Sequence, residues 1–187
     1  MNISMHSTKS YFVVWLAAAA LAVALAVASP SESRVMGHLP AFMAHTLTRQ
    51  PVAIPAGLPS DRTLALITFQ REHRDQAESW IEGLDWKNDP SIAWMHMPIV
   101  NDPGTPTGRS VVEAKLLQRY PFDSERSQMV PVFTDRADFV RSVGLNGVGQ
   151  SYAVVVNRQG DVLARVEGRF DAEKAKILRE TLKATDF

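Results

Sequence analysis

From residue 62 onward, short apolar runs alternate with segments whose apolar residues recur at helical spacing. The runs predict strands over residues 63–69, 91–100 and 129–133, each apolar enough to be covered on both faces. The intervening segments predict helices over residues 71–84 and 110–120, and a shorter helix follows the third run. This alternation is typical of parallel strands joined by helical crossovers.

Polar residues at the edges of these segments predict where the helices begin. Ser110 and Glu113 have the spacing of a capping box, so the second helix is expected to start at Ser110. Pro121 is expected to end that helix. Asp135 is expected to cap the third helix and Asp171 the last one. The last helix is expected to bury three apolar residues: Ile177, Leu178 and Leu182.

The C-terminal half adds a hairpin to this order. Residues 151–156 and 162–168 read as strands, and the polar turn Asn157–Asp161 between them predicts that they pair antiparallel. The complete order is strand-helix-strand-helix-strand-helix-hairpin-helix. It predicts an α/β domain over residues 62–187 with a mixed sheet flanked by helices.

The N-terminal part follows a different pattern. Lys9 precedes the apolar run 11–28, which ends in Ala26-Val27-Ala28, and these are the parts of a signal peptide over residues 1–28. A retained membrane anchor is the alternative, because the run approaches the length of a bilayer span. Both readings place the remainder beyond a membrane, and we predict the periplasm. Residues 29–61 are rich in proline and predict an extended segment with short extended pieces around 46–54.

Composition excludes two classes of function. The 20 basic and 20 acidic residues balance without a basic cluster, so no nucleic-acid partner is predicted. There is no cysteine, so the chain has neither a disulfide nor a thiolate nucleophile.

Two segments carry a resemblance to a known superfamily. VRSVGLNGVGQSYAVVVNRQGDVLARVEGRF resembles the ending shared by peroxiredoxin-like domains. The earlier run NDPGTPTGRSVVEAKLLQRYP resembles the YtfJ family of periplasmic proteins and is similar to mitochondrial ATP synthase assembly factors. The resemblance implies a thioredoxin-like fold, βαβαβα-ββ-α, behind an N-terminal Pro-rich extension. Neither family has an assigned catalytic residue that would imply one in this chain.

The same resemblance shows where redox relatives keep their active site. Their cysteines lie where the first strand meets the first helix, which here is 70–76, and their cis-proline corresponds to 149–152. Because this chain has no cysteine and no proline there, thiol–disulfide exchange and cysteine peroxidase activity are excluded. We expect a partner-binding groove at these segments and near 101–108, with these candidate residues: Arg71, Glu72, His73, Arg74, Asp75, Gln150, Ser151 and Tyr152.

The chemistry of that groove has several interpretations. Arg71 and Arg74 suit a carboxylate or phosphate, and His73 suits proton transfer, while an ordinary solvated helix start is the plainest alternative. Met95, His96 and Met97 are metal-ligand types suited to Cu(I). Strand alternation separates His96 from the two methionines, which favours a buried core instead.

No cofactor is therefore predicted. The main hypothesis is a redox-inactive accessory protein that binds another envelope or membrane protein. The alternatives are a periplasmic Met/His copper carrier and an enzyme centred on His73. Contact with the membrane itself is expected only through the N-terminal segment, if that segment is not cleaved.

Overall fold

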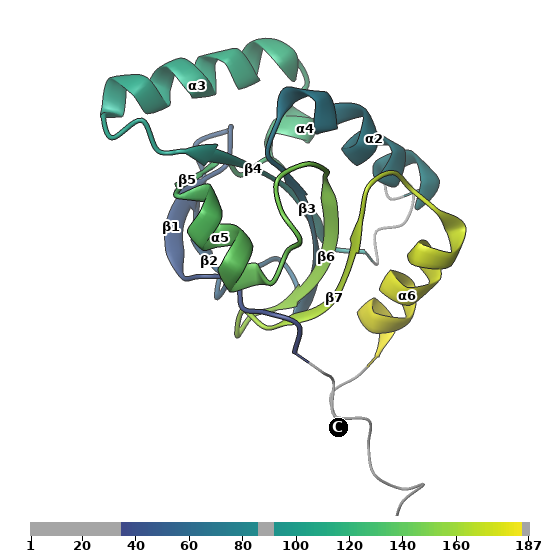
Figure 1. The fold of residues 1–187 in the computed structure, drawn as a ribbon. Coiled ribbons are helices and arrows are strands. Elements are labelled where there is room, and N and C mark those ends of the chain that lie inside the picture. The colour runs from purple at the N-terminus through teal and green to yellow at the C-terminus, as the bar shows by residue number, and fades with distance from the viewer. Residues whose placement is uncertain (1–34, 86–91, 185–187) are drawn as a thin grey trace, which may run out of the picture. The chain divides into compact units, whose positions relative to one another are not determined.

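A five-stranded mixed sheet forms the centre of the protein (Figure 1). The computed structural model describes residues 35–85 and 92–184, so the predicted signal peptide lies outside the described residues. The strand order is β5-β4-β3-β6-β7. The strands are β3 (Arg62–Thr68), β4 (Trp94–Asn101), β5 (Val132–Thr134), β6 (Tyr152–Asn157) and β7 (Val162–Glu167). The first three are parallel, and β6 and β7 run antiparallel, as the sequence predicted.

The central strand β3 is buried on both faces because its side chains are apolar at every position from Leu64 to Ile67. Leu64 and Leu66 belong to one apolar cluster, and Ala65 and Ile67 belong to another on the opposite face. The first cluster lies under α2 (Arg74–Gly83) and α6 (Ala172–Lys183). The second lies under α5 (Arg136–Val143) and the N-terminal segment.

The expected caps of the last two helices are confirmed. The Asp135 carboxylate accepts the backbone N–H of residue 138, and Asp171 accepts those of residues 173 and 174. The predicted apolar stripe of α6 is partly wrong. Leu178 is fully buried, whereas Ile177 is 52% exposed because it lies on the solvent side of the helix.

The predicted start of the second crossover helix is wrong. The helix α3 (Pro106–Arg119) begins four residues earlier, so Ser110 lies inside it. Thr105 is the cap, since its side chain accepts the backbone N–H of Gly108, and Pro106 has the fixed φ that suits a first helical position. No residue of α3 is buried, and a short helix α4 (Asp123–Arg126) that the sequence reading missed follows it.

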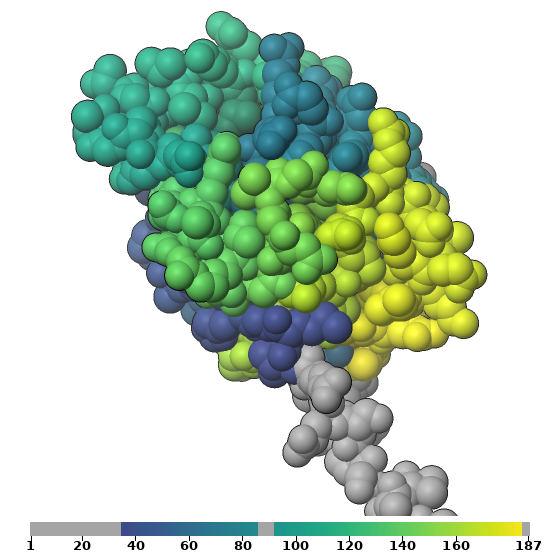
Figure 2. Space-filling model, viewed as in Figure 1, coloured from purple at the N-terminus to yellow at the C-terminus, as the bar shows by residue number. Residues whose placement is uncertain are grey.

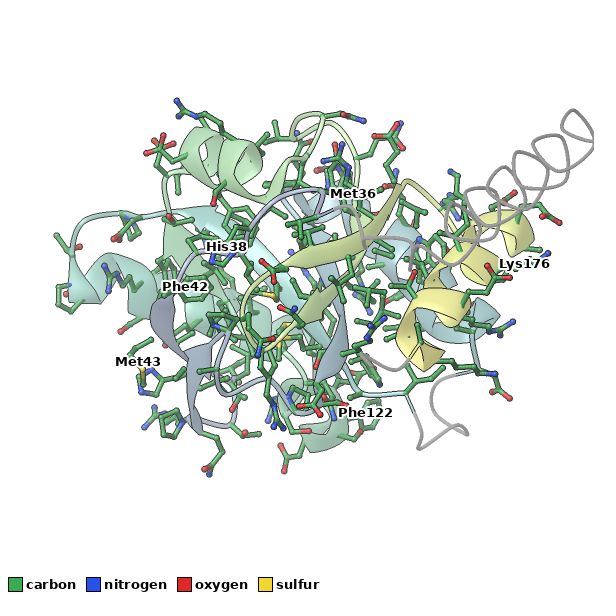
Figure 3. The ribbon with its side chains drawn as sticks, turned by 90° about the horizontal axis from the view of Figure 1, so that it is seen from below. Met36, His38, Phe42, Met43, Phe122 and Lys176 are labelled. Carbon is green, nitrogen blue, oxygen red and sulfur yellow. The ribbon has the colours of Figure 1, made fainter. Side chains whose placement is uncertain are left out.

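The N-terminal segment forms a hairpin of its own. Its strands β1 (Phe42–His45) and β2 (Pro51–Ile54) make a separate two-stranded antiparallel sheet. Ala44 and Ile54 point into the core, while Met43 projects into solvent (Figure 3). The boundary at residue 61 stays a prediction, although this hairpin contributes to the core of the domain. None of the helices within 35–85 and 92–184 is long and apolar enough to cross a bilayer.

Candidate functional site

The turn between β3 and α2 is fastened to the loop before β6. A single 3-10 turn, η1 (Arg71–His73), leads from β3 into α2. The His73 ring is buried, its Nδ1 accepts the backbone N–H of Phe69 over 3.4 Å, and the ring also interacts with the backbone of Gly149. The Gln76 side-chain oxygen accepts the backbone N–H of Ser151 over 2.8 Å. We call this set of contacts the His73 joint.

The joint decides what His73 is able to do. Burial lowers the pKa of the ring, which outweighs the opposite effects of the Gly149 bond and of Glu72. The Nδ1 nitrogen is engaged with the backbone, and the ring is 3% exposed. His73 therefore connects the end of β3 with the loop before β6, and its ring has little contact with solvent.

The other predicted site residues divide between surface and interior. Arg71, Glu72, Asp75 and Gln150 are exposed, whereas the last two residues of the predicted set are buried. The Ser151 hydroxyl donates to the carbonyl of Gly168 over 3.4 Å. The Tyr152 ring meets the Phe69 ring edge-on, 6.3 Å between centroids, and burial raises the pKa of its phenol.

The loop 101–108 was expected to border the same groove. Asp102 there forms an ion pair with Arg109, and its carboxylate also accepts the backbone N–H of Gly104. These bonds lower the pKa of the Asp102 carboxyl. The loop is thus bonded to Arg109 in the first turns of α3. None of its residues lines the cavity beside η1 that is described next. Binding of a partner at any of these residues stays a prediction.

A cavity of about 170 Å³ opens at the carboxyl ends of β3 and β4. It is bordered by η1 and α2 on one side and by the C-terminal end of α3 on the other, and Figure 2 shows α2 (blue) and α3 (teal) along the same edge of the molecule. We call it the arginine groove because four arginines line it: Arg71, Arg74, Arg119 and Arg136.

Two of these arginines are held in place by neighbouring groups. The Arg74 Nε donates to Glu78, and the guanidinium lies 5.2 Å from the centroid of the Tyr120 ring. Arg136 donates to the carbonyls of Ile99 and Phe69, over 3.0 and 2.6 Å. It therefore connects the ends of β4 and β3.

The sequence predicted Arg71 and Arg74 as site residues but not Arg119 and Arg136. The carboxyl ends of neighbouring parallel strands meet at one edge of a sheet. Arg136 follows the third predicted strand closely, so this rule applied to it would have pointed to the same edge.

His96 forms the floor of the groove, 6% exposed. Its Nε2 lies 3.0 Å from the Thr68 hydroxyl, and its ring meets that of Tyr120 edge-on. Burial, aided by the charge of Arg74, lowers its pKa to about 4. Met95 and Met97 lie in the apolar cluster on the other face of the sheet. Within 35–85 and 92–184, no three His, Cys, Asp or Glu side chains come close enough to hold a metal ion.

Several solved structures resemble the fold of this chain. A crystal structure of an electron-transport candidate from Aquifex aeolicus VF5 has a TM-score of 0.56 at 8% identity, covering 80% of this chain and 98% of the other. BsSco, a member of the Sco family of cytochrome c oxidase assembly proteins, has a TM-score of 0.52 at 14% identity over 78% and 91%. A thiol:disulfide interchange protein from Bacteroides sp. has 0.51 at 16% over 80% and 91%. The fold is thioredoxin-like.

The comparisons go no further than the fold. No family model and no curated protein sequence matches the chain. The resemblance to the YtfJ family and to ATP synthase assembly factors therefore stays a prediction. Since the chain has no cysteine, the thiol chemistry named for the Bacteroides neighbour has no nucleophile here.

Proposed function

We propose that this protein is an exported, redox-inactive thioredoxin-like accessory protein that binds another envelope protein. The observation that carries the proposal is the His73 joint. It holds the two segments that form the active site of redox relatives in a fixed arrangement, with exposed polar side chains around it and no thiol. A surface that is rigid and lacks a nucleophile is suited to recognition.

Two further features support this proposal. The His73 ring is buried and its Nδ1 is bonded to the backbone, which speaks against an enzyme centred on that residue. The sequence of residues 1–28 supports export to the periplasm. Resemblance to the YtfJ family and to ATP synthase assembly factors belongs to the same proposal, since it describes accessory proteins of this fold.

The test is photocrosslinking in living cells from two positions beside the joint. A photoreactive amino acid replaces Glu72 in one variant and Gln150 in another, because both side chains are exposed and come from the two joined segments. Lys176 is the control position, exposed on α6 (Figure 3). Captured species are identified by mass spectrometry.

The expected result is one discrete envelope-protein adduct shared by positions 72 and 150 and absent at position 176. The same adduct at all three positions, or none at 72 and 150, would contradict a specific surface at the joint. An adduct with a cytoplasmic protein would contradict export.

A further inference from the structure

The arginine groove carries an excess of positive charge. The residues that line it include four arginines and no aspartate or glutamate. Arg74 is paired with Glu78 beside the groove, and Arg136 is bonded only to neutral carbonyl oxygens of the backbone. Among the described residues, neither Arg71 nor Arg119 has an ion-pair partner or a hydrogen-bond partner. Three of the four guanidiniums therefore lack a counter-charge within residues 35–85 and 92–184.

The Tyr120 phenol adds a neutral donor to the same site, whereas the Thr68 hydroxyl is bonded to His96 and the Gln70 amide to the carbonyl of Val148. A planar guanidinium binds a carboxylate or a phosphate through two parallel N–H bonds. The polar part of the groove thus fits an anion with two or more oxygens.

The walls of the groove decide between a free ion and an anion on a larger molecule. The apolar residues of the lining are the partly exposed Val100 and Leu116 and the buried Phe69, Pro98 and Ile99. An inorganic ion leaves Val100 and Leu116 in contact with water, whereas a segment that also has apolar side chains covers them, at about 25 cal/mol per Å² of apolar surface. The volume of about 170 Å³ is too small for a drug-sized ligand and fits one or two side chains.

We propose that the arginine groove binds an acidic segment of a partner protein, with carboxylate side chains at the guanidiniums and apolar side chains against the walls. The inference rests on the proposed function, because it names the chemistry of the partner's docking segment. It places that segment between η1 and the end of α3.

The experiment measures binding of two model peptides to the purified chain by isothermal titration calorimetry. The acidic probe is an acetylated and amidated peptide in which leucine alternates with aspartate and glutamate. The matched probe has asparagine and glutamine at the acidic positions. Inorganic phosphate is the third probe, because it supplies the anion without the apolar groups.

The variant is R71Q combined with R119Q. It removes the two guanidiniums that have neither an ion-pair partner nor a hydrogen-bond partner among the described residues. The matched control is R169Q combined with R179Q, which removes two exposed arginines near and on α6 with the same change in net charge. Circular dichroism and thermal melting confirm that both variants are folded, and R71Q alone serves as a second, milder variant.

We expect the acidic peptide to bind at least tenfold more tightly than the neutral one, and to weaken at least tenfold in the groove variant but less than twofold in the control. We also expect its binding to weaken as salt is raised. Equal binding of both peptides, equal weakening in both variants, or binding of phosphate without the acidic peptide would overturn the inference. Failure of the native protein to bind the acidic peptide, together with a crosslink from position 72, would refute the groove and leave the accessory function standing.

Discussion

The His73 joint and the arginine groove share the same short turn, η1, and differ in how their polar groups are satisfied. In the joint, the Nδ1 of His73 and the side-chain oxygen of Gln76 each accept a backbone N–H. In the groove, Arg71 and Arg119 have no ion-pair partner among the described residues. Buried polar groups that are paired hold a fold together, whereas a solvated guanidinium without a counter-charge is free to bind an anion.

This difference between the joint and the groove shows that residues adjacent in sequence can have different roles. His73 turns inward and fixes the scaffold, whereas the arginines at 71 and 74 line the groove. The ring of His73 is buried and bonded within the fold, whereas the arginines around it are the residues that we propose for recognition. The substitutions below separate these two roles by measuring stability and binding independently.

The largest effect is expected from H73A. It removes a buried ring, leaves a cavity, and leaves the Phe69 N–H and the Gly149 backbone without their partner. We expect the free energy of unfolding to fall by about 4 kcal/mol. Urea denaturation followed by circular dichroism measures it. E72A is the control at an exposed position, and a loss in H73A no larger than in E72A would contradict the joint.

The second effect is a dependence of stability on pH that comes from His96. Its pKa is lowered from 6.5 to about 4 in the folded state, so the unfolded chain binds this proton first as pH falls. The contribution of the neutral His96 to the free energy of unfolding is therefore complete above pH 6.5 and is lost as the pH falls from 6.5 to 4. The full shift corresponds to a loss of about 3 kcal/mol.

The check compares the pH profile of the unfolding free energy in the native protein and in H96Q, which keeps a polar group facing Thr68. The profile of H96Q is expected to be flatter between pH 6.5 and 4. Carboxylates titrate in both proteins, so their contribution cancels in the difference. Superimposable profiles would show that His96 is protonated without cost and that the floor of the groove is open to water.

The strands were predictable because local apolar runs determine them, as β3 shows: predicted over 63–69 and observed over 62–68. The start of α3 was not, because Thr105-Pro106 and Ser110-x-x-Glu113 are both capping signals and sequence alone does not rank them. The β1–β2 hairpin depends on contacts of Ala44 and Ile54 with the core, which are not local. Its strands were therefore located only approximately.

The candidate site was predictable only in part. The end of β3 locates Arg71 and Arg74, because the turn follows directly after a clear strand. The groove also needs Arg119 and Arg136, which come from elements far along the chain and meet the first pair only when the parallel strands align. Which side chains turn inward was equally hidden, since a histidine in a polar run carries no local sign of burial.

A smaller effect is expected from Q76A. This change removes the acceptor of the Ser151 N–H at a partly buried position and leaves the His73 ring in place. The unfolding free energy is expected to fall by about 1 kcal/mol, which is the usual value of one neutral hydrogen bond. Urea denaturation measures the loss, and faster hydrogen exchange at the amide of Ser151 assigns it to this bond. Unchanged exchange at that amide would show that the bond contributes nothing.

The smallest effect on stability is expected from R71Q combined with R119Q, although it removes two charges. Neither side chain has a partner to lose within the described residues, and removing like charges from one groove relieves repulsion. The unfolding free energy should change by less than about 0.5 kcal/mol, measured by urea denaturation at low salt. A loss above about 1 kcal/mol would make these arginines part of the scaffold, like His73, and the distinction between the joint and the groove would fail. An unchanged free energy of unfolding would show that the two charges do not stabilise the fold, which is what their proposed role in recognition requires.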